Sequence, residues 1–273
     1  MPSPTTISLQ KFSRLVGTPR CPQVVDVRTD DDFAADPRLI PGSLRRPFST
    51  VAAWAGPSGG GGAVVVCEKG LKLSEGVAAL LRHAGGGADV LEGGFRAWAD
   101  AGLPLVPADR LPPRDAEGRT VWVTRSRPKV DRIACPWLIR RFVDPWAVFL
   151  FVAPSEVQAV ADRFAAAPFD IEGVFWSHRG ETCTFDTMVA ELGLATEPLL
   201  RLARIVRGAD TARPDLAPQA AGLLAASLGL SRLHSDDLRQ LDAGMGLYDA
   251  LYLWCRDAVD EPHDWPSAKG ARP

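Results

Sequence analysis

The chain has 273 residues, about twice the length of a typical domain, so two domains are expected. Hydrophobic residues make up 46% of the chain and charged residues 23%, which excludes wholesale disorder. The formal net charge of -2 gives no electrostatic reason to expect binding to nucleic acid or to a membrane surface. Five cysteines, an odd number at low density, argue against a disulfide-stapled secreted scaffold.

No apolar run has the length of a membrane span, because the longest, from Trp146 to Ala153, is far too short. The first residues carry neither the basic flank nor the apolar core of a signal peptide. We therefore expect a cytoplasmic protein. In that compartment the question for each cysteine is reactivity or metal binding rather than cross-linking.

A charged, proline-rich segment without apolar periodicity divides the chain. This segment, residues 108–119, is typical of a linker between domains. We therefore expect a first domain over residues 1–107, a second domain over residues 120–257 and a loosely held tail over residues 258–273.

Strand and helix patterns alternate in the first domain. Residues 23–28 and 63–67 are short β-branched runs, as buried parallel strands require. Residues 74–83 carry an apolar helical face, residues 89–91 predict a further strand, and residues 95–101 a further helix. The pattern predicts an α/β domain with a parallel sheet and flanking helices.

The second domain is predicted to be mixed α+β and rich in helix. Strands are expected over residues 120–124 and 147–152, with a helix between them over residues 136–142 that has proline in its first turn. Two long amphipathic helices follow, over residues 214–228 and over residues 235–257, the latter capped by its first serine.

Cys67 stands where a buried strand ends and a loop leads into a helix. In such an arrangement the loop N–H groups and the helix dipole point at the sulfur and form an anion cradle. The same field lowers the pKa of a thiol, so we expect Cys67 to be largely thiolate near neutral pH. Gly70 permits the tight turn, and two lysines add positive charge. The predicted anion-binding loop consists of Glu68, Lys69, Gly70, Leu71 and Lys72.

Four segments together give residues 7–107 a resemblance to a rhodanese-family sulfurtransferase domain. They are Val25-Asp26-Val27-Arg28, Ile40-Pro41-Gly42-Ser43, Cys67 at the head of its loop, and Leu91-Glu92-Gly93-Gly94-Phe95-Arg96-Ala97-Trp98. The resemblance implies that Cys67 accepts sulfane sulfur from a small-molecule donor such as thiosulfate, becomes a persulfide and passes the sulfur to an acceptor. It also implies a structural salt bridge between Asp26 and Arg28 near the site.

Two positions depart from the family pattern. Lys72 stands where the family usually has arginine, and Leu39 replaces the histidine before Ile-Pro-Gly. A lysine binds an anion as a point charge without a bidentate fork, so the donor preference is expected to differ. A phosphatase of the same fold needs arginine six positions after the cysteine. That position is Leu73, which argues against a phosphatase and leaves an inactive rhodanese domain as the other alternative.

Basic residues concentrate at the start of the second domain, over residues 125–142. Several basic side chains and the N-terminus of the expected helix could together bind an oxyanion. The candidate anion-binding residues are Arg132, Cys135 and Arg140. The alternatives are a solvated basic face and a nucleic-acid patch. Two prolines and one acid break the run, which argues against nucleic acid as a partner.

A second cluster in this domain has the mixed composition of a metal site. His178 and Glu181 are the main candidate ligands for a divalent or iron-type metal, with Cys183, Asp186 and Asp210 as further candidates. Each has an ordinary alternative: His178 as a partly buried histidine, Asp186 in the first turn of a helix, and Asp210 as a cap.

Residues 120–257 are similar to the C-terminal domain of ChrB-type chromate-resistance proteins. Four segments carry this similarity: R-P-K-V-D-R-I-A-C-P-W-L-I-R-R-F, H-R-G-E-T-C-T-F-D, I-V-R-G-A-D-T and G-M-G-L-Y-D-A-L-Y. The similarity implies a role in resistance to chromate or a related oxyanion, which would then be a ligand, or to oxidative stress. The fusion to a rhodanese-like domain in place of a DNA-binding module favours an enzyme over a transcription factor.

The expected function is therefore a cytoplasmic sulfurtransferase coupled to an oxyanion-linked second domain. Two rivals stay open: a redox or oxyanion sensor that works by binding, and a metalloenzyme to which the rhodanese-like domain is accessory.

Overall fold

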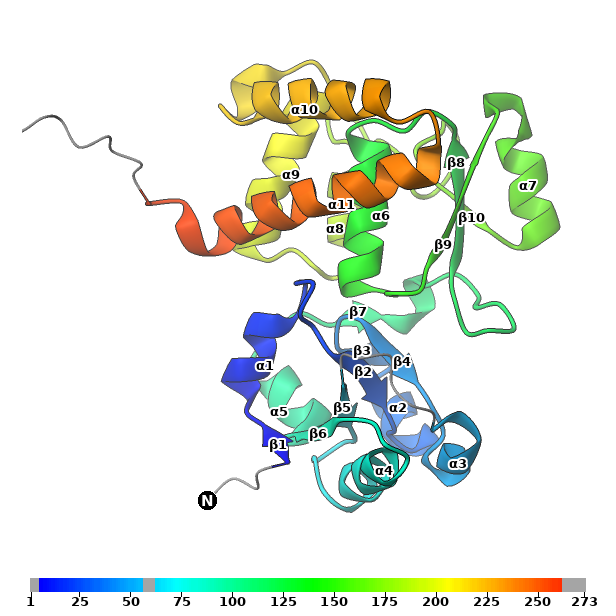
Figure 1. Cartoon of the computed structure of the whole chain (residues 1–273), viewed down its shortest axis with the longest axis vertical. Coiled ribbons are helices and arrows are strands. Elements are labelled where there is room, and N and C mark those ends of the chain that lie inside the picture. The colour runs from blue at the N-terminus through cyan, green and yellow to red at the C-terminus, as the bar shows by residue number, and fades with distance from the viewer. Residues whose placement is uncertain (1–4, 56–61, 262–273) are drawn as a thin grey trace, which may run out of the picture.

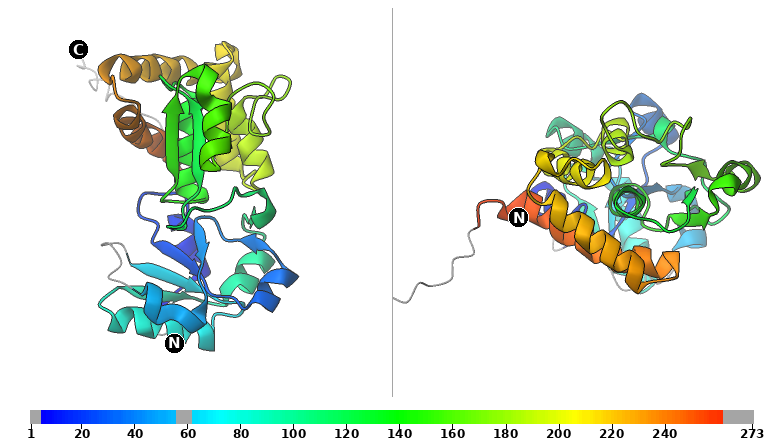
Figure 2. Two further views of the ribbon diagram at one scale, coloured as in Figure 1. Left: turned by 90° about the vertical axis from the view of Figure 1, so that its right-hand side faces the viewer. Right: turned by 90° about the horizontal axis from the view of Figure 1, so that it is seen from above.

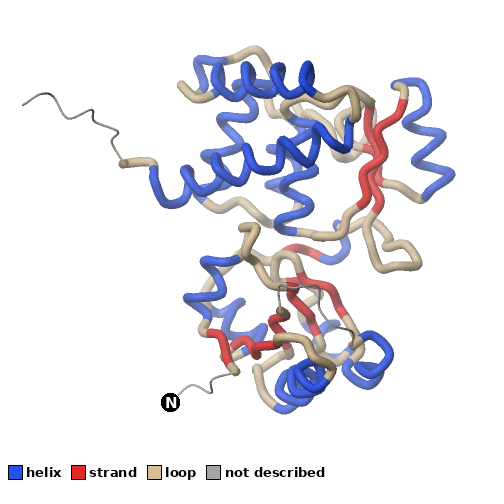
Figure 3. Tube along the Cα trace, in the orientation of Figure 1, coloured by secondary structure: helices blue, strands red, loops and turns tan. Residues whose placement is uncertain are grey.

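The computed structural model describes residues 5–55 and 62–261, and most of the predicted tail over 258–273 lies outside them. An N-terminal unit, residues 5–107, and a C-terminal unit, residues 120–261, stack along the long axis of the molecule (Figures 1 and 2). Each unit contains a small parallel sheet flanked by helices (Figure 3). No helix within the described ranges is both long and apolar enough to span a membrane.

A five-stranded parallel sheet forms the centre of the N-terminal unit, because its β-branched runs favour extended backbone and bury well on both faces. Its strands, in spatial order, are β1 (Thr6–Ile7), β6 (Ala88–Leu91), β5 (Ala63–Val66), β2 (Gln23–Asp26) and β4 (Ser43–Arg45). A short antiparallel pair lies beside it, formed by β3 (Arg38–Leu39) and β7 (Val106–Pro107).

Successive side chains of a strand point to opposite faces of the sheet, and helices cover both faces. Val24, Val64 and Val66 share a core with α1 and α5, whereas Val25 and Val65 pack with α3 and α4. The predicted α/β fold with a parallel sheet and flanking helices is confirmed. The helices are α1 (Leu9–Leu15), α2 (Asp30–Ala35), α3 (Val51–Trp54), α4 (Lys72–His83) and α5 (Gly94–Asp100).

The C-terminal unit is rich in helix, as predicted, and its sheet has three parallel strands, one more than expected. Its strand order is β10 (Ala167–Pro168), β8 (Val121–Arg125), β9 (Val148–Val152). Val123 and Val157 share a small core on the α7 side of the sheet, whereas Trp122 and Phe149 belong to the main core with α6. The helices are α6 (Asp131–Phe142), α7 (Val157–Phe164), α8 (Thr184–Glu191), α9 (Glu197–Asp210), α10 (Ala220–Leu233) and α11 (Asp237–Leu253), which ends in a π-helical turn at Trp254–Ala258.

Three helix boundaries differ from the prediction. The helix expected over 136–142 begins at Asp131 and places Pro136 in its interior, because burial of most of α6 outweighs the hydrogen bond that the proline removes. The helix expected over 214–228 begins at Ala220, after a 3₁₀ turn. The cap of α11 is Asp236, not Ser235: its carboxylate accepts a hydrogen bond from the N–H of Arg239 at 2.8 Å.

The two units share one hydrophobic core. The ring of Phe142, at the end of α6, occupies the space beside Gly17 in which a side chain would lie, and the carbonyl of Phe142 accepts a hydrogen bond from the N–H of Gly42 at 2.7 Å. The connecting segment 108–119 is tied to the C-terminal unit by an ion pair of 3.2 Å between Arg114 and the buried Asp144.

The amino ends of strands from both sheets meet at this contact. A cavity of about 280 Å³ is lined by Gln23 at the start of β2, by Gly62 before β5, and by Pro145 and Trp146 before β9. The carboxyl ends of the same strands therefore lie away from the contact, one set in each unit.

Candidate functional sites

Cys67 lies at the carboxyl end of β5, and its side chain is buried. Its carbonyl accepts a hydrogen bond from the N–H of Phe95 at 2.9 Å, and the carbonyl of Glu68 accepts one from the N–H of Arg96 at 3.0 Å. The loop after Cys67 is thus attached by its backbone to the start of α5. Helix α4 begins at Lys72, two residues before the predicted start, so the helix N-terminus lies closer to Cys67 than expected.

Gly70 and Gly94 fix the shape of this loop. Both have positive φ, 65° and 62°, a conformation that strongly favours glycine. A Cβ on Gly94 would overlap the carbonyl oxygen of Cys67 and the nitrogen of Gly70, and one on Gly70 would overlap the carbonyl oxygen of Leu91. The two backbones therefore approach each other as closely as glycine allows.

A buried ion pair supports the same loop. The Arg28 guanidinium pairs with the carboxylate of Asp26 at 2.6 Å, and both side chains are almost completely buried. The guanidinium also lies over the ring of Phe95, 3.6 Å from the ring centroid. The salt bridge implied by the family resemblance is therefore present, and it positions the residue whose N–H binds the carbonyl of Cys67.

The remaining loop residues point to solvent or to surface partners. Glu68 pairs with Arg96 at 3.4 Å, whereas Lys69, Leu71 and Lys72 are exposed. The two lysines can therefore meet an anion that approaches from solvent.

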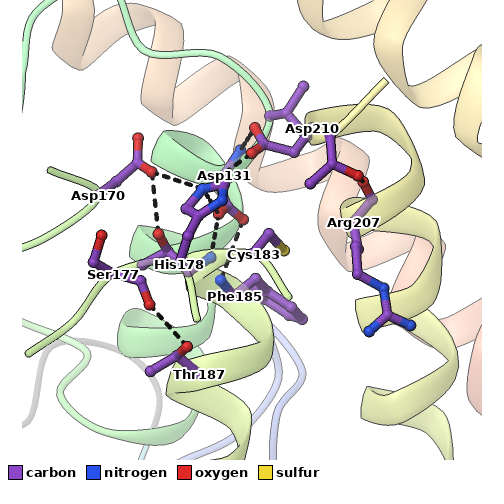
Figure 4. Close-up of polar contacts among 12 residues, drawn as sticks. Asp131, Asp170, Ser177, His178, Cys183, Phe185, Thr187, Arg207 and Asp210 are labelled. Atoms are coloured by element: carbon purple, nitrogen blue, oxygen red, sulfur yellow. Dashed lines mark hydrogen bonds and ion pairs between the residues drawn. The ribbon is translucent and has the colours of Figure 1, made fainter. Parts of the chain in front are cut away.

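A second constellation lies in the C-terminal unit, where His178 is surrounded by three aspartates (Figure 4). The Nε2 atom of His178 is 3.2 Å from a carboxylate oxygen of Asp170, 3.3 Å from one of Asp210 and 3.5 Å from one of Asp131. We call these four residues the Asp₃His cluster. Ligand atoms of Asp131, Asp170 and His178 all lie within 4.8 Å of one another, close enough to share one metal ion.

The cluster is assembled from distant parts of the chain. Asp131 is the first residue of α6, Asp210 is the last of α9, Asp170 follows β10, and His178 lies in the loop before α8. Val130, which precedes Asp131, has a φ of 35°, a strained value for a β-branched residue.

Backbone and hydroxyl donors hold two of the carboxylates. Asp131 is fully buried and accepts hydrogen bonds from the N–H groups of Thr184 (2.7 Å) and Phe185 (3.3 Å), at the N-terminus of α8. Asp170 accepts one from the hydroxyl of Thr184 at 3.0 Å and pairs with Arg125 at 3.1 Å and Arg132 at 3.2 Å.

The carboxylates differ in their protonation equilibria. Burial, together with the charges of the neighbouring aspartates, raises the pKa of Asp131 well above its usual value and raises that of Asp210. Burial also acts to raise the pKa of Asp170, but the hydrogen bond from His178 and the charge of Arg132 outweigh it, so that pKa is lowered. The hydrogen bond to Asp170 raises the pKa of His178. The site thus concentrates negative charge that a cation would neutralise.

The predicted metal candidates separate in the structure. His178 and Asp210 belong to the Asp₃His cluster. Cys183 caps α8 and donates to the carboxylate of Asp186 at 3.2 Å, and burial raises the pKa of its thiol. Asp186 pairs with Arg207 at 3.5 Å. Glu181 lies in the tight turn that pairs Arg179 with Thr182, outside the cluster.

Asp131 and Asp170 are the members that the sequence analysis did not identify. In the sequence Asp131 stands out only as an acid that interrupts a basic run. A signal for Asp170 was available, because polar residues after parallel strands gather at the carboxyl edge of a sheet, where sites usually form.

The predicted anion-binding residues of α6 do not converge. Arg132 pairs with Asp170 beside the cluster. Cys135 is fully buried, and burial raises the pKa of its thiol well above the usual value. Arg140, near the other end of the helix, pairs with Asp242 at 3.1 Å and lines the cavity between the units.

The Cys67 loop and the Asp₃His cluster are separate sites. Each lies at the carboxyl edge of its own sheet, whereas the units touch near the amino edges. Helix α6 alone sets about 16 Å between Asp131 and Phe142, at 1.5 Å per residue. Direct transfer of an atom between the two sites of one chain is therefore not possible in this arrangement.

Solved structures similar to this chain are matched over about the length of its N-terminal unit. A rhodanese-like domain protein from Staphylococcus aureus is 29% identical, with 36% of this chain and 95% of that chain covered and a TM-score of 0.32. A thiosulfate sulfurtransferase from Pseudomonas aeruginosa is 26% identical, with 40% of this chain and 21% of that chain covered and a TM-score of 0.33.

The family comparisons match the two units one by one. Residues 8–101 match the model of the rhodanese-like domain, and residues 122–255 match that of the ChrB C-terminal domain. Protein ChrB of Cupriavidus metallidurans is 36% identical over 156 residues, 55% of this chain. The match spans less than half, 46%, of that relative. The chain therefore consists of a rhodanese-like domain followed by a ChrB C-terminal domain.

Proposed function

We propose that the protein is a cytoplasmic sulfurtransferase that carries sulfane sulfur on Cys67. The observation that carries this proposal is the position of Cys67 at the end of a buried strand, at the head of a loop fixed by Gly70 and Gly94. The N–H groups of the loop, the N-terminus of α4 and Lys72 supply the positive potential that a bound persulfide anion requires.

The transfer takes two displacements at sulfur. The Cys67 thiolate attacks the outer sulfur of thiosulfate, the S–S bond of the donor breaks, and sulfite leaves with the electron pair. The product is a Cys67 persulfide. An acceptor thiolate then attacks the outer sulfur, so that the acceptor becomes the persulfide and Cys67 is released as thiolate. Because Cys67 lies far from the other candidate site, the acceptor is a diffusible molecule.

Intact mass measures the first displacement directly. Reduced protein exposed briefly to thiosulfate should gain one sulfur atom, about 32 Da, and the Cys67→Ser variant should gain none. Cys21→Ser is the matched control and should keep the gain, since burial raises the pKa of Cys21 to about 11 and keeps it protonated. Absence of the gain with thiosulfate and with other sulfane donors would overturn the proposal.

We infer a second function for the ChrB C-terminal domain, which is to bind a cation. The family of this domain suggests chromate-type oxyanions as further ligands. The supporting observation is that one imidazole nitrogen lies within 3.5 Å of three carboxylates. Three carboxylates and one imidazole suit a hard or borderline divalent ion such as Mn²⁺ or Fe²⁺. The ion would offset the repulsion among Asp131, Asp170 and Asp210. The rival reading is that protonated His178, together with Arg125 and Arg132, neutralises the carboxylates without a metal ion.

Titration of the metal-free protein with Mn²⁺, followed by the loss of the free-ion electron paramagnetic resonance signal, separates these readings. We expect one ion per chain, with affinity lowered at least about 10-fold by His178→Ala. His234→Ala, in the same domain, should bind Mn²⁺ like the unaltered protein. If neither Mn²⁺ nor Fe²⁺ binds, the cluster is an ion-pair network and the second function is wrong.

A further inference from the structure

The sheet of the C-terminal unit ends in a strand, β9, that pairs on one side only within the described residues. In the strand order β9 comes last, after β8. It has five residues, whereas the edge strands β1 and β10 have two and β4 has three. A groove of about 460 Å³ follows β9, and the start of α11 forms its other wall. The outer edge of β9 is therefore open to a further strand.

Two residues of β9 direct their backbone groups to this open side. The N–H of Val148 donates at 2.9 Å to the residue before β8, and the carbonyl of Val152 accepts at 2.7 Å from the residue after β8. Backbone groups of successive residues in a strand point to alternate sides, so Leu150, between them, also faces β8. The N–H and C=O groups of Phe149 and Phe151 face the groove instead.

The sequence lacks the features that usually protect such an edge. Charged side chains or a proline within the strand normally prevent pairing with another chain. Residues 145–155 contain no charged residue, and Pro145 and Pro154 lie outside β9. The side chain of Trp146 is 61% exposed, and that of Leu238, on the α11 wall of the groove, is 50% exposed. An apolar edge of this kind indicates a protein partner.

The residues around β9 form a palindrome, which identifies the partner. Residues 147–153 read Ala-Val-Phe-Leu-Phe-Val-Ala in either direction. In an antiparallel pair about a two-fold axis at Leu150, every one of these residues opposes a residue of its own type. Phe149 lies opposite the partner's Phe151, and because both face the groove, the two exchange both backbone hydrogen bonds. Trp146 lies opposite the partner's Pro154. A second copy of the same strand therefore fits this edge at every position.

We propose that the protein forms a two-fold dimer in which the β9 strands of two copies pair antiparallel. The two three-stranded sheets then become one sheet of six strands. The contact consists of one strand, Trp146 and the start of α11 from each copy, so the buried area is on the order of 1,000 Å², the lower end for a specific interface. We therefore expect a Kd of roughly 10 µM.

Sedimentation equilibrium of the full chain, from about 1 to about 100 µM, measures this association. Trp146→Ala should raise the Kd about 10-fold, because the variant loses a large apolar ring at both ends of the contact. Phe164→Ala is the matched control. Phe164 is an aromatic residue of the same unit with the same exposure, 61%, but it ends α7, next to the opposite edge of the sheet. Its variant should dimerise like the unaltered protein.

The position of Leu150 on the axis tests the register. Leu150→Lys and Leu150→Glu each place two like charges opposite one another, so neither variant should dimerise at about 100 µM. An equimolar mixture of the two should form a heterodimer, because opposite charges then meet. Circular dichroism checks that both variants are folded. The proposal is overturned by a chain that is monomeric at every concentration, by a dimer that these substitutions leave intact, or by a mixture that stays monomeric.

Discussion

Replacing Gly94 by alanine should reduce sulfur uptake at Cys67 about 100-fold, the usual effect of displacing a reacting group by about 1 Å. Gly94 has positive φ, and an added Cβ would overlap the Cys67 carbonyl oxygen and the Gly70 nitrogen, both of them backbone atoms. Backbone cannot move aside as a flexible side chain can. The loop must shift, and with it the backbone that carries Cys67 and the N–H groups after it. The rate of the 32 Da mass gain with thiosulfate measures the effect.

The Gly85→Ala variant is the control that separates displacement of the loop from backbone strain. Gly85 also has positive φ, 88°, but nothing lies within 4 Å of a Cβ added there. Gly85→Ala should therefore lose about 1 kcal/mol of stability and keep its rate of sulfur uptake. Equal rates in the two variants, with both folded by circular dichroism, would mean that the loop tolerates displacement and that its shape does not control the chemistry.

Gly17→Ala should destabilise the whole protein by about 3 kcal/mol, which corresponds to a fall in Tm of roughly 10 °C. The added Cβ would overlap the ring of Phe142, and Gly17 has a φ of 77°. The ring cannot retreat easily, because Trp137 and Tyr252 pack against it with centroids at 5.8 and 5.5 Å. The backbone strain at Gly17 and the overpacking against Phe142 therefore both lower the stability. Scanning calorimetry gives the shift.

Gly102→Ala provides the comparison, since Gly102 has a φ of 65° and open space around an added Cβ. It should show the strain alone, about 1 kcal/mol. Because the units share one core, the unaltered protein should unfold in a single transition, and Gly17→Ala should move that transition as one. Two separate transitions, with only one of them moved, would contradict a shared core.

The N-terminal unit follows its sequence closely, for a physical reason. Its strands are β-branched runs buried on both faces, so local preference and burial favour the same structure. In the C-terminal unit, local preference and burial favour different structures. Pro136 marks a helix start in local terms, yet packing extends α6 back to Asp131, directly after the strained Val130.

The Asp₃His cluster shows that closeness along the sequence does not predict which side chains come together. His178 stands out in the sequence because acidic and thiol side chains follow it closely, but its contacts are with aspartates from α6, α9 and the end of β10. Glu181, only three residues away, lies outside the cluster. Spacing along a loop does not determine which side chains converge. The packing of the domain does, by bringing the start of α6 and the end of α9 to the residues that follow β10.

The meeting of the two sheets at their amino ends has an evolutionary consequence. The Cys67 loop and the loops that carry Asp170 and His178 lie on edges that the contact between the units does not use. Substitutions that alter the donor preference of one site or the ligand of the other need not disturb the common core. Each half can therefore diverge in its chemistry while the chain remains a single folded body.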